Sequence, residues 1–257
     1  LPLALLRIQK IKGRDYLYLF IVGLVGSVAP AFLFAKAQTG IDSNLAGILN
    51  SLTSLFTLIV GVSFFGLKTK WFNVLGVFLA LLGAIGLISV SGSNNFAFNL
   101  TYSFYVMIAT ICYAFNVNIV KKYLRHLDSI SITSISFFMV GFPIIGYLVL
   151  FTDFSHQIIN EKEALAGLGY VSILAVVGTG LALIAFNYLI KISSPVFAAS
   201  VTYLIPVVAI MWGIIDGEAF KPNYIIWVVL ILFGVLLVNT NYQNRFFKSL
   251  TARIKNT

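Results

Sequence analysis

The chain has 257 residues, of which 60% are apolar and only 10% are charged, and its mean hydropathy is +0.98. Soluble domains are about 45–50% apolar and about 25% charged, so this composition excludes a soluble enzyme and a disordered chain. The net charge of +9 comes from basic residues in short gaps between apolar runs, which indicates membrane topology rather than a nucleic-acid partner. We therefore expect an all-α polytopic membrane protein in contact with the lipid bilayer.

Residues 1–6 are apolar but too few to cross a bilayer, and we interpret them as the end of an apolar segment. Eight long apolar runs follow, each long enough for a hydrocarbon core of about 30 Å at a rise of about 1.5 Å per residue. None alternates as barrel strands do, and backbone groups in lipid must be paired within the segment, so the runs predict helices. They cover residues 16–36, 43–66, 71–90, 100–121, 130–151, 165–190, 195–215 and 224–240.

The basic residues predict the orientation of these helices. With the residues before the first run in the cytoplasm, only Lys36, Lys162 and Lys221 of the 17 basic residues fall outside. Basic residues accumulate on the cytoplasmic side of membrane proteins. We therefore expect a multi-pass protein of the cell (inner) membrane with both ends of this chain, including its C-terminus, in the cytoplasm.

An internal repeat relates two pairs of runs. Residues 44–89 align with residues 195–240 without a gap at a shift of 151, so that Gly66 meets Gly217 and Gly83 meets Gly234. Each segment is a long helix, a break with Gly and Lys, and a second long helix. The two segments have opposite orientations in the predicted topology, which is typical of the inverted repeats of secondary transporters.

The repeat also predicts the domain organisation. Three runs precede residue 99 and five follow it, so two further helices at the front would complete a ten-helix bundle of two inverted five-helix repeats. We assign residues 1–92 to the C-terminal part of the first repeat, residues 99–241 to the second repeat, and residues 242–257 to a basic cytoplasmic tail.

These segments resemble a known family. Residues 46–89, with the break at Gly66, look like the second part of an EamA-type repeat of the drug/metabolite transporter superfamily. The second half is more similar, with Ser-Pro-Val-Phe-Ala-Ala at 194–199, Tyr-Leu-Ile-Pro-Val-Val at 203–208 and Gly-Glu at 217–218. The resemblance covers residues 1–240. It implies ten helices around a central cavity, of which this chain lacks the first two, and export or exchange of small metabolites such as amino acids.

The first repeat departs from this pattern in two places. Gly66 is followed by Leu67 instead of Glu, and the expected proline near Leu55 is absent. We therefore expect the first half to have a less typical role in gating.

Neutral polar residues on the predicted helices are the candidate substrate-binding residues. Asn50, Ser54 and Thr57 recur at helical spacing and so share one face. Such a stripe forms either a polar cavity wall or a close helix contact, because small hydroxyl residues also hydrogen-bond between helices. The same two interpretations apply to Tyr113 and Asn116 in the fourth run.

The sixth and seventh runs carry the candidate hinges. Gly178 and Gly180 predict a bend in the sixth run, two turns before Asn187, a further candidate binding residue. Pro206 interrupts the seventh run, and the carbonyl groups freed near Thr202 and Tyr203 are open to a ligand, to water or to a neighbouring helix. Pro206 is predicted to be a hinge or binding point, with a purely architectural kink as the alternative.

The eight runs contain no Asp, Glu or His at mid-depth. Catalytic carboxylate pairs, metal sites and catalytic triads need such groups close together, so we expect no enzymatic activity, metal or cofactor. The sequence favours a secondary transporter that moves a small neutral or zwitterionic metabolite, amino acid-like or drug-like, by alternating access, in the direction of export. A membrane-embedded lipid-modifying transferase and a non-transporting scaffold are the alternatives, and a homodimer is one open alternative for the oligomeric state.

Overall fold

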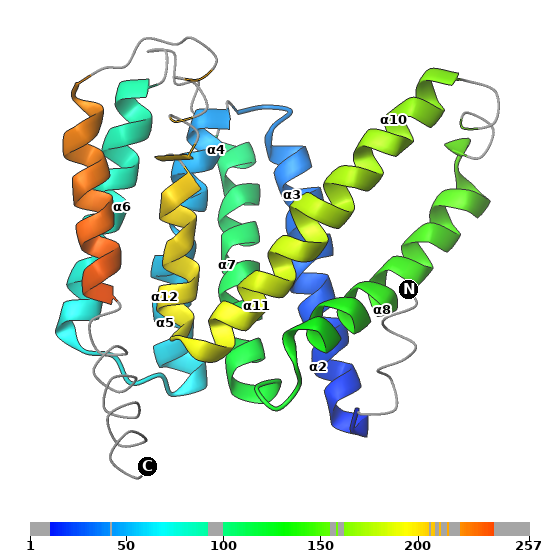
Figure 1. The fold of residues 1–257 in the computed structure, drawn as a ribbon, viewed down its shortest axis with the longest axis horizontal. Coiled ribbons are helices and arrows are strands. Elements are labelled where there is room, and N and C mark those ends of the chain that lie inside the picture. Colours follow the sequence, from blue (N-terminus) through cyan, green and yellow to red (C-terminus); the bar gives the residue numbers. More distant parts are fainter. Residues whose placement is uncertain are drawn as a thin grey trace, which may run out of the picture. The chain divides into compact units, whose positions relative to one another are not determined.

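A computed structural model describes residues 11–41, 43–91, 100–154, 158, 162–205, 207–208, 211, 215 and 222–238. All regular structure in these ranges is helical (Figure 1). The helices form two compact units, Leu1–Val28 with Ile119–Ile192, and Ala29–Asn118 with Ser193–Thr257. Each unit is described by itself below.

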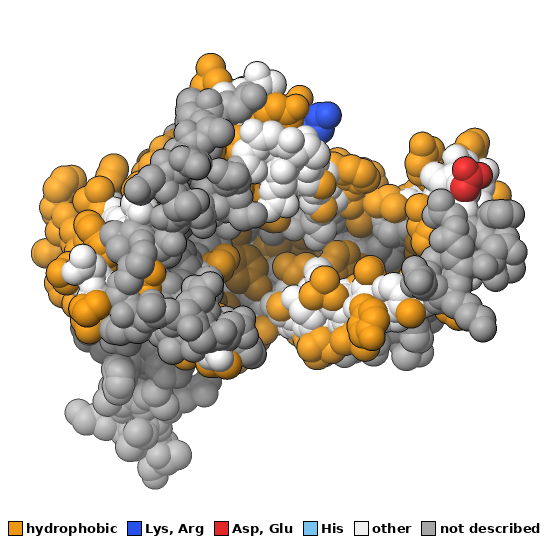
Figure 2. Space-filling model, turned by 90° about the horizontal axis from the view of Figure 1, so that it is seen from above, with side chains coloured by type: hydrophobic (Ala, Val, Ile, Leu, Met, Phe, Trp, Pro, Cys, Tyr) orange, Lys and Arg blue, Asp and Glu red, His pale blue; other side chains and the backbone are white. Residues whose placement is uncertain are grey.

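The described chain has eight apolar helices, and each overlaps one of the eight predicted runs. Four are long enough to cross a membrane, namely Gly13–Ala37, Leu100–Tyr123, Ser129–Phe151 and Leu165–Ile192, and four are shorter, namely Thr53–Phe65, Trp71–Gly86, Pro195–Leu204 and Tyr224–Val238. Large apolar side chains remain exposed on them, and Figure 2 shows such side chains over much of the described surface on one face. Exposed apolar surface of this extent is suited to lipid rather than water, as predicted for an all-helical polytopic membrane protein.

The first unit contains α2 (Gly13–Gly23), η2 (Leu24–Val28), α8 (Ser129–Phe151), α10 (Lys162–Ile173), η3 (Leu174–Leu181) and α11 (Ala182–Ile192). Helix α8 packs against both α2 and α11. Gly23 makes the close approach to α2 possible, because a Cβ there would lie 2.8 Å from the carbonyl oxygen of Ser136. Asp128 caps the start of α8 by accepting hydrogen bonds from the Ser131 backbone N–H and hydroxyl at 3.2 and 2.6 Å.

The second unit contains α3 (Ala29–Ala37), α4 (Ser43–Asn50), α5 (Thr53–Phe65), α6 (Trp71–Ser91), most of α7 (Leu100–Tyr123), α12 (Pro195–Ser200), η4 (Val201–Leu204) and the Tyr224–Val238 helix. Helix α5 packs against α12, and α6 packs against α4 and η4. Gly66 ends α5 with a φ of 67°, a left-handed conformation that glycine adopts without strain, and the Leu67 N–H then bonds back to the Gly61 carbonyl at 2.8 Å.

The second predicted run is not one helix. It breaks at Ser51 and Leu52 into α4 and α5, so the prediction of one continuous helix over residues 43–66 is wrong. The Thr53 hydroxyl donates to the Asn50 carbonyl at 2.7 Å, and the Ser51 hydroxyl donates to the Gly47 carbonyl at 3.0 Å. Side-chain hydroxyls that bond to nearby carbonyls compete with the helical ladder, and two of them meet at this turn.

Helix α6 and the Tyr224–Val238 helix pack antiparallel through glycine. A Cβ on Gly83 would lie 2.9 Å from the Ile231 nitrogen, and a Cβ on Gly234 would lie 2.5 Å from the Ala80 nitrogen. The shift of 151 residues exchanges these two contacts, since it takes Gly83 to Gly234 and Ala80 to Ile231. The contact is therefore symmetric in the register of the sequence repeat. The complete ten-helix architecture remains a prediction.

Two long helices share another irregularity. The helix of residues 13–37 widens into the π-helical turn η2, and the helix of residues 165–192 widens into η3. In the predicted repeats these are the third helix of each half. In a π-helical turn the backbone hydrogen bonds span five residues instead of four, and such turns often mark a functional position.

Candidate functional site

Ser54 and Thr57 are fully buried on α5, as their shared helical face predicts. The Thr57 hydroxyl donates to the Thr53 carbonyl at 2.7 Å and is therefore used within its own helix. Ser54 interacts with the Tyr203 hydroxyl, but no contact of its Oγ among the described residues has the full geometry of a hydrogen bond. Buried hydroxyls are normally paired, so Ser54 is the member of this pair with spare hydrogen-bonding capacity.

Tyr203 and Thr202 occupy η4 in the second unit. The Tyr203 side chain is fully buried and donates to the Val77 carbonyl of α6 at 3.4 Å. The Thr202 hydroxyl instead donates to the Ala199 carbonyl at 2.8 Å, one turn back. Of the two, Tyr203 connects different helices. Pro206, the predicted hinge, lies outside the described residues.

Asn118 of α7 is a buried polar residue that the predicted set omits. Its side chain is 2% exposed, and its amide donates to the Thr57 carbonyl at 3.1 Å and to the Ala114 carbonyl at 2.9 Å. A signal existed in the sequence, because Thr110, Ala114 and Asn118 are small or polar at intervals of four, the spacing of one helix face.

Asn116 and Tyr113 lie on a different side of α7 from Asn118. The Tyr113 ring contacts Phe34 of α3, with ring centroids 6.3 Å apart. Asn116 is 5% exposed, and its Oδ1 has no hydrogen-bond partner within the described part of the chain. The two predicted residues of α7 therefore lie away from the side of the helix on which Asn118 bonds to α5.

Asn50 belongs to the break between α4 and α5. Its carbonyl and side-chain oxygens accept from the Thr53 hydroxyl at 2.7 and 3.4 Å, and the residue is half-buried. The structure thus brings Asn50 next to Thr53 in the turn rather than into line with Ser54.

Asn187 is the only predicted binding residue that belongs to the first unit. It lies on α11, is 5% exposed, and donates to the Thr133 hydroxyl of α8 at 2.9 Å. Gly178 and Gly180 lie in η3, where the helix widens at the position predicted to bend.

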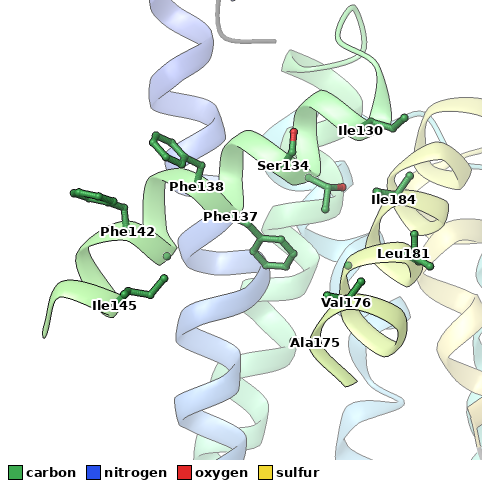
Figure 3. A pocket seen from close by; sticks show the side chains of 13 residues that line it. Ile130, Ser134, Phe137, Phe138, Phe142, Ile145, Ala175, Val176, Leu181 and Ile184 are labelled. Carbon is green, nitrogen blue, oxygen red and sulfur yellow. The ribbon is translucent and has the colours of Figure 1, made fainter. Parts of the chain in front are cut away.

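A cavity of about 550 Å³ opens between α8 and the η3–α11 segment, and Gly180 is part of its lining. The wall is largely apolar, and Figure 3 shows Phe137 of α8 reaching toward Val176 and Leu181. Thr133 and Ser134 supply hydroxyl groups, and the Ser134 Oγ is buried without a partner among the described residues. The cavity can accommodate an apolar or aromatic group together with one hydrogen bond.

Charged groups are rare inside both units. Asp15 is the one charged residue among those that are buried in the described chain, and no group of three His, Cys, Asp or Glu that could hold a metal occurs in the ranges given above. Apart from Asp15, the buried polar side chains of the described residues carry neutral hydroxyls and amides. This arrangement defines a polytopic α-helical membrane protein with a neutral polar interior.

Comparison with known proteins identifies the family. The model of the EamA-like transporter family matches residues 1–89 and 100–240, and the chain belongs to this family. The resemblance seen in the sequence is thus confirmed, and the protein is a membrane transporter by family.

The relatives agree with this assignment. The chain is 26% identical over 243 residues to the "Uncharacterized inner membrane transporter YedA" of Escherichia coli (strain K12), covering 93% of this chain and 76% of that protein. It is 24% identical over 232 residues to an "Uncharacterized transporter" of Archaeoglobus fulgidus, covering 90% of this chain and 80% of that protein. A solved crystal structure shares the fold at a TM-score of 0.68 and 13% identity, covering 88% of this chain and 76% of that chain.

Proposed function

We propose that the protein is a secondary transporter that exports a small neutral or zwitterionic metabolite, amino acid-like or drug-like, by alternating access. The observation that carries the proposal is a pair of buried neutral oxygens in the second unit, Ser54 Oγ and Asn116 Oδ1, that have no partner among the described residues. Unpaired buried polar atoms are costly, and a neutral polar solute would supply the missing hydrogen bonds.

The proposed substrate charge follows from the groups present. Interior acids and bases accompany charged or proton-coupled transport, and Asp15, the one buried charged residue in the described chain, lies in the first turn of α2. Hydroxyl and amide groups recognise a solute with no net charge. The export direction is carried over from the resemblance to the family.

Alternating access is supported by the symmetric contact of α6 with the Tyr224–Val238 helix. Two halves with opposite orientations can open in turn to either side of the bilayer. The contact between Gly83 and Ile231 and its counterpart between Gly234 and Ala80 are the kind of relationship that such halves produce. We place both ends of this chain in the cytoplasm, because that orientation leaves most basic residues inside.

Solute counterflow into liposomes tests this function. We expect the purified chain to exchange radiolabelled neutral amino acids or neutral amphiphilic drugs, and S54V to reduce the rate at least tenfold, because one substrate hydrogen bond is lost. S63V is the matched control, since it makes the same change at an exposed position of the same helix. Flux that strictly requires an imposed pH gradient, or equal rates for S54V and S63V, contradicts the proposal.

A further inference from the structure

A second cavity, of about 560 Å³, lies in the first unit where α2 begins and α7 turns into α8. Its walls carry two cations, a contact between a carboxylate and a histidine ring, and two aromatic rings. The residues are Lys12, Arg14, Asp15, Tyr18, Tyr123 and His126. None of them is among the groups proposed to bind the transported solute, and the site is separate from the proposed transport function.

The aromatic wall is amphipathic. The rings of Tyr18 and Tyr123 stack with their centroids 4.4 Å apart and their planes 3° from parallel. Lys122 places its Nζ 5.5 Å from the Tyr123 ring centroid. Tyrosine rings are enriched at the headgroup level of membranes, where one edge is apolar and the other is wet.

The one carboxylate that lines the cavity already has two hydrogen-bond partners. Asp15 is 8% exposed, and its Oδ2 lies 2.9 Å from His126 Nε2 and accepts from the Lys12 backbone N–H at 3.2 Å. The side chains of Lys12 and Arg14 are exposed. The cavity therefore presents two cations toward solvent, while its carboxylate is occupied by the His126 ring and by the backbone N–H of Lys12.

We propose that this cavity binds the phosphate headgroup of an anionic phospholipid. Lys12 and Arg14 contact the phosphate, for which the guanidinium of Arg14 can supply two parallel hydrogen bonds. Basic pockets at the cytoplasmic ends of membrane helices suit anionic headgroups, and the predicted orientation places this cavity at that end.

The neighbouring surface favours a lipid over a free anion. Leu17 lies one turn beyond Arg14 and is 62% exposed, and Phe20 is 41% exposed further along the same helix. An acyl chain attached to the bound phosphate can lie along these apolar side chains. A free phosphate gains nothing from them.

Lipid titration of the purified full chain in zwitterionic detergent tests the proposal. Short-chain phosphatidylglycerol should raise the melting temperature saturably, whereas short-chain phosphatidylcholine and inorganic phosphate should not. K12Q/R14Q should bind phosphatidylglycerol about 25-fold more weakly, because each basic residue near an anionic surface contributes about a factor of five. K68Q/K70Q removes two exposed cations elsewhere and should keep the affinity of the unmodified chain.

Three results overturn the proposal. Equal stabilisation by phosphatidylcholine would show that binding needs no anionic group. Saturation by inorganic phosphate at similar affinity would show that this is a free-anion site. Unchanged phosphatidylglycerol binding by K12Q/R14Q would show that the lipid binds elsewhere. The melting temperatures without lipid show whether each variant is folded. If the double variant is not folded, the single variants K12Q and R14Q are compared in the same titration.

Discussion

Gly83 of α6 and Gly234 of the Tyr224–Val238 helix hold equivalent places in one antiparallel helix contact, each against the backbone of the other helix. The Ile231 nitrogen lies 2.9 Å from a Cβ built on Gly83, and the Ala80 nitrogen lies 2.5 Å from one built on Gly234. Neighbouring backbone cannot move aside as the end of a side chain can. The two helices can therefore approach this closely only because neither position carries a side chain.

This relationship predicts that G83A and G234A each destabilise the protein. Overpacking a close contact costs about 1–3 kcal/mol, and the symmetric geometry predicts similar losses for the two variants. Thermal unfolding of the purified protein measures both. G141A is the control, because nothing lies within 4 Å of a Cβ at that position of α8. A melting temperature for G234A that matches that of G141A contradicts the prediction.

Composition and apolar run length were sufficient to predict the helical membrane class, because satisfying the backbone in lipid leaves few alternatives. The break at Ser51 and Leu52 was not predictable from run length, since it depends on hydroxyls that bond to the carbonyls of Gly47 and Asn50. Hydropathy does not distinguish a hydroxyl that bonds locally from one that faces a partner.

The candidate site shows the same limit. Periodicity correctly placed Ser54 on a buried face of α5, but it could not show that Ser54 lacks a partner while Thr57 bonds to its own helix. On α7 the predicted set contains Asn116 and omits Asn118, although both are buried. Which amide bonds across to α5 depends on how α7 is rotated against its neighbour, and a single helix pattern does not contain that rotation.

Asn118 should matter more for stability than the hydroxyl of Thr57. N118A removes the amide that donates to the Thr57 carbonyl at 3.1 Å and to the Ala114 carbonyl at 2.9 Å, and loss of a buried hydrogen bond costs about 1–3 kcal/mol. T57V keeps the backbone carbonyl that Asn118 contacts and removes only a bond within α5. Thermal unfolding should rank N118A well below T57V, and the reverse order would show that the contact between α7 and α5 is weak.

Lys121 should hold the end of α11 in place. Its Nζ donates to the Ile190 and Lys191 carbonyls at 3.0 and 2.8 Å, and the Lys191 Nζ donates in turn to the Leu127 carbonyl. Terminal helix carbonyls lack intrahelical partners and are stabilised by cations. In K121M we expect amide hydrogen exchange in residues 188–194 to accelerate about tenfold, the factor that about 1.4 kcal/mol corresponds to.

K122M is the control for this effect, because Lys122 is the adjacent, exposed lysine on the same helix. Exchange in residues 188–194 should stay at the rate of the unmodified chain in K122M. Equal acceleration in both variants would assign the effect to the lost charge rather than to the two hydrogen bonds.

Thr133 and Ser134 are adjacent hydroxyl residues of α8, and removing the hydroxyl should destabilise the protein at Thr133 but not at Ser134. Thr133 Oγ1 accepts from the Asn187 amide at 2.9 Å, so T133V leaves a buried donor unpaired at a cost of about 1–3 kcal/mol. Ser134 Oγ is buried with no partner among the described residues, and S134A removes an unsatisfied atom at little or no cost. Thermal unfolding should show a loss for T133V alone. A loss in S134A of the same size would mean that the Ser134 hydroxyl is paired in the folded protein, and would remove it as a free hydrogen-bonding group of the cavity beside Phe137.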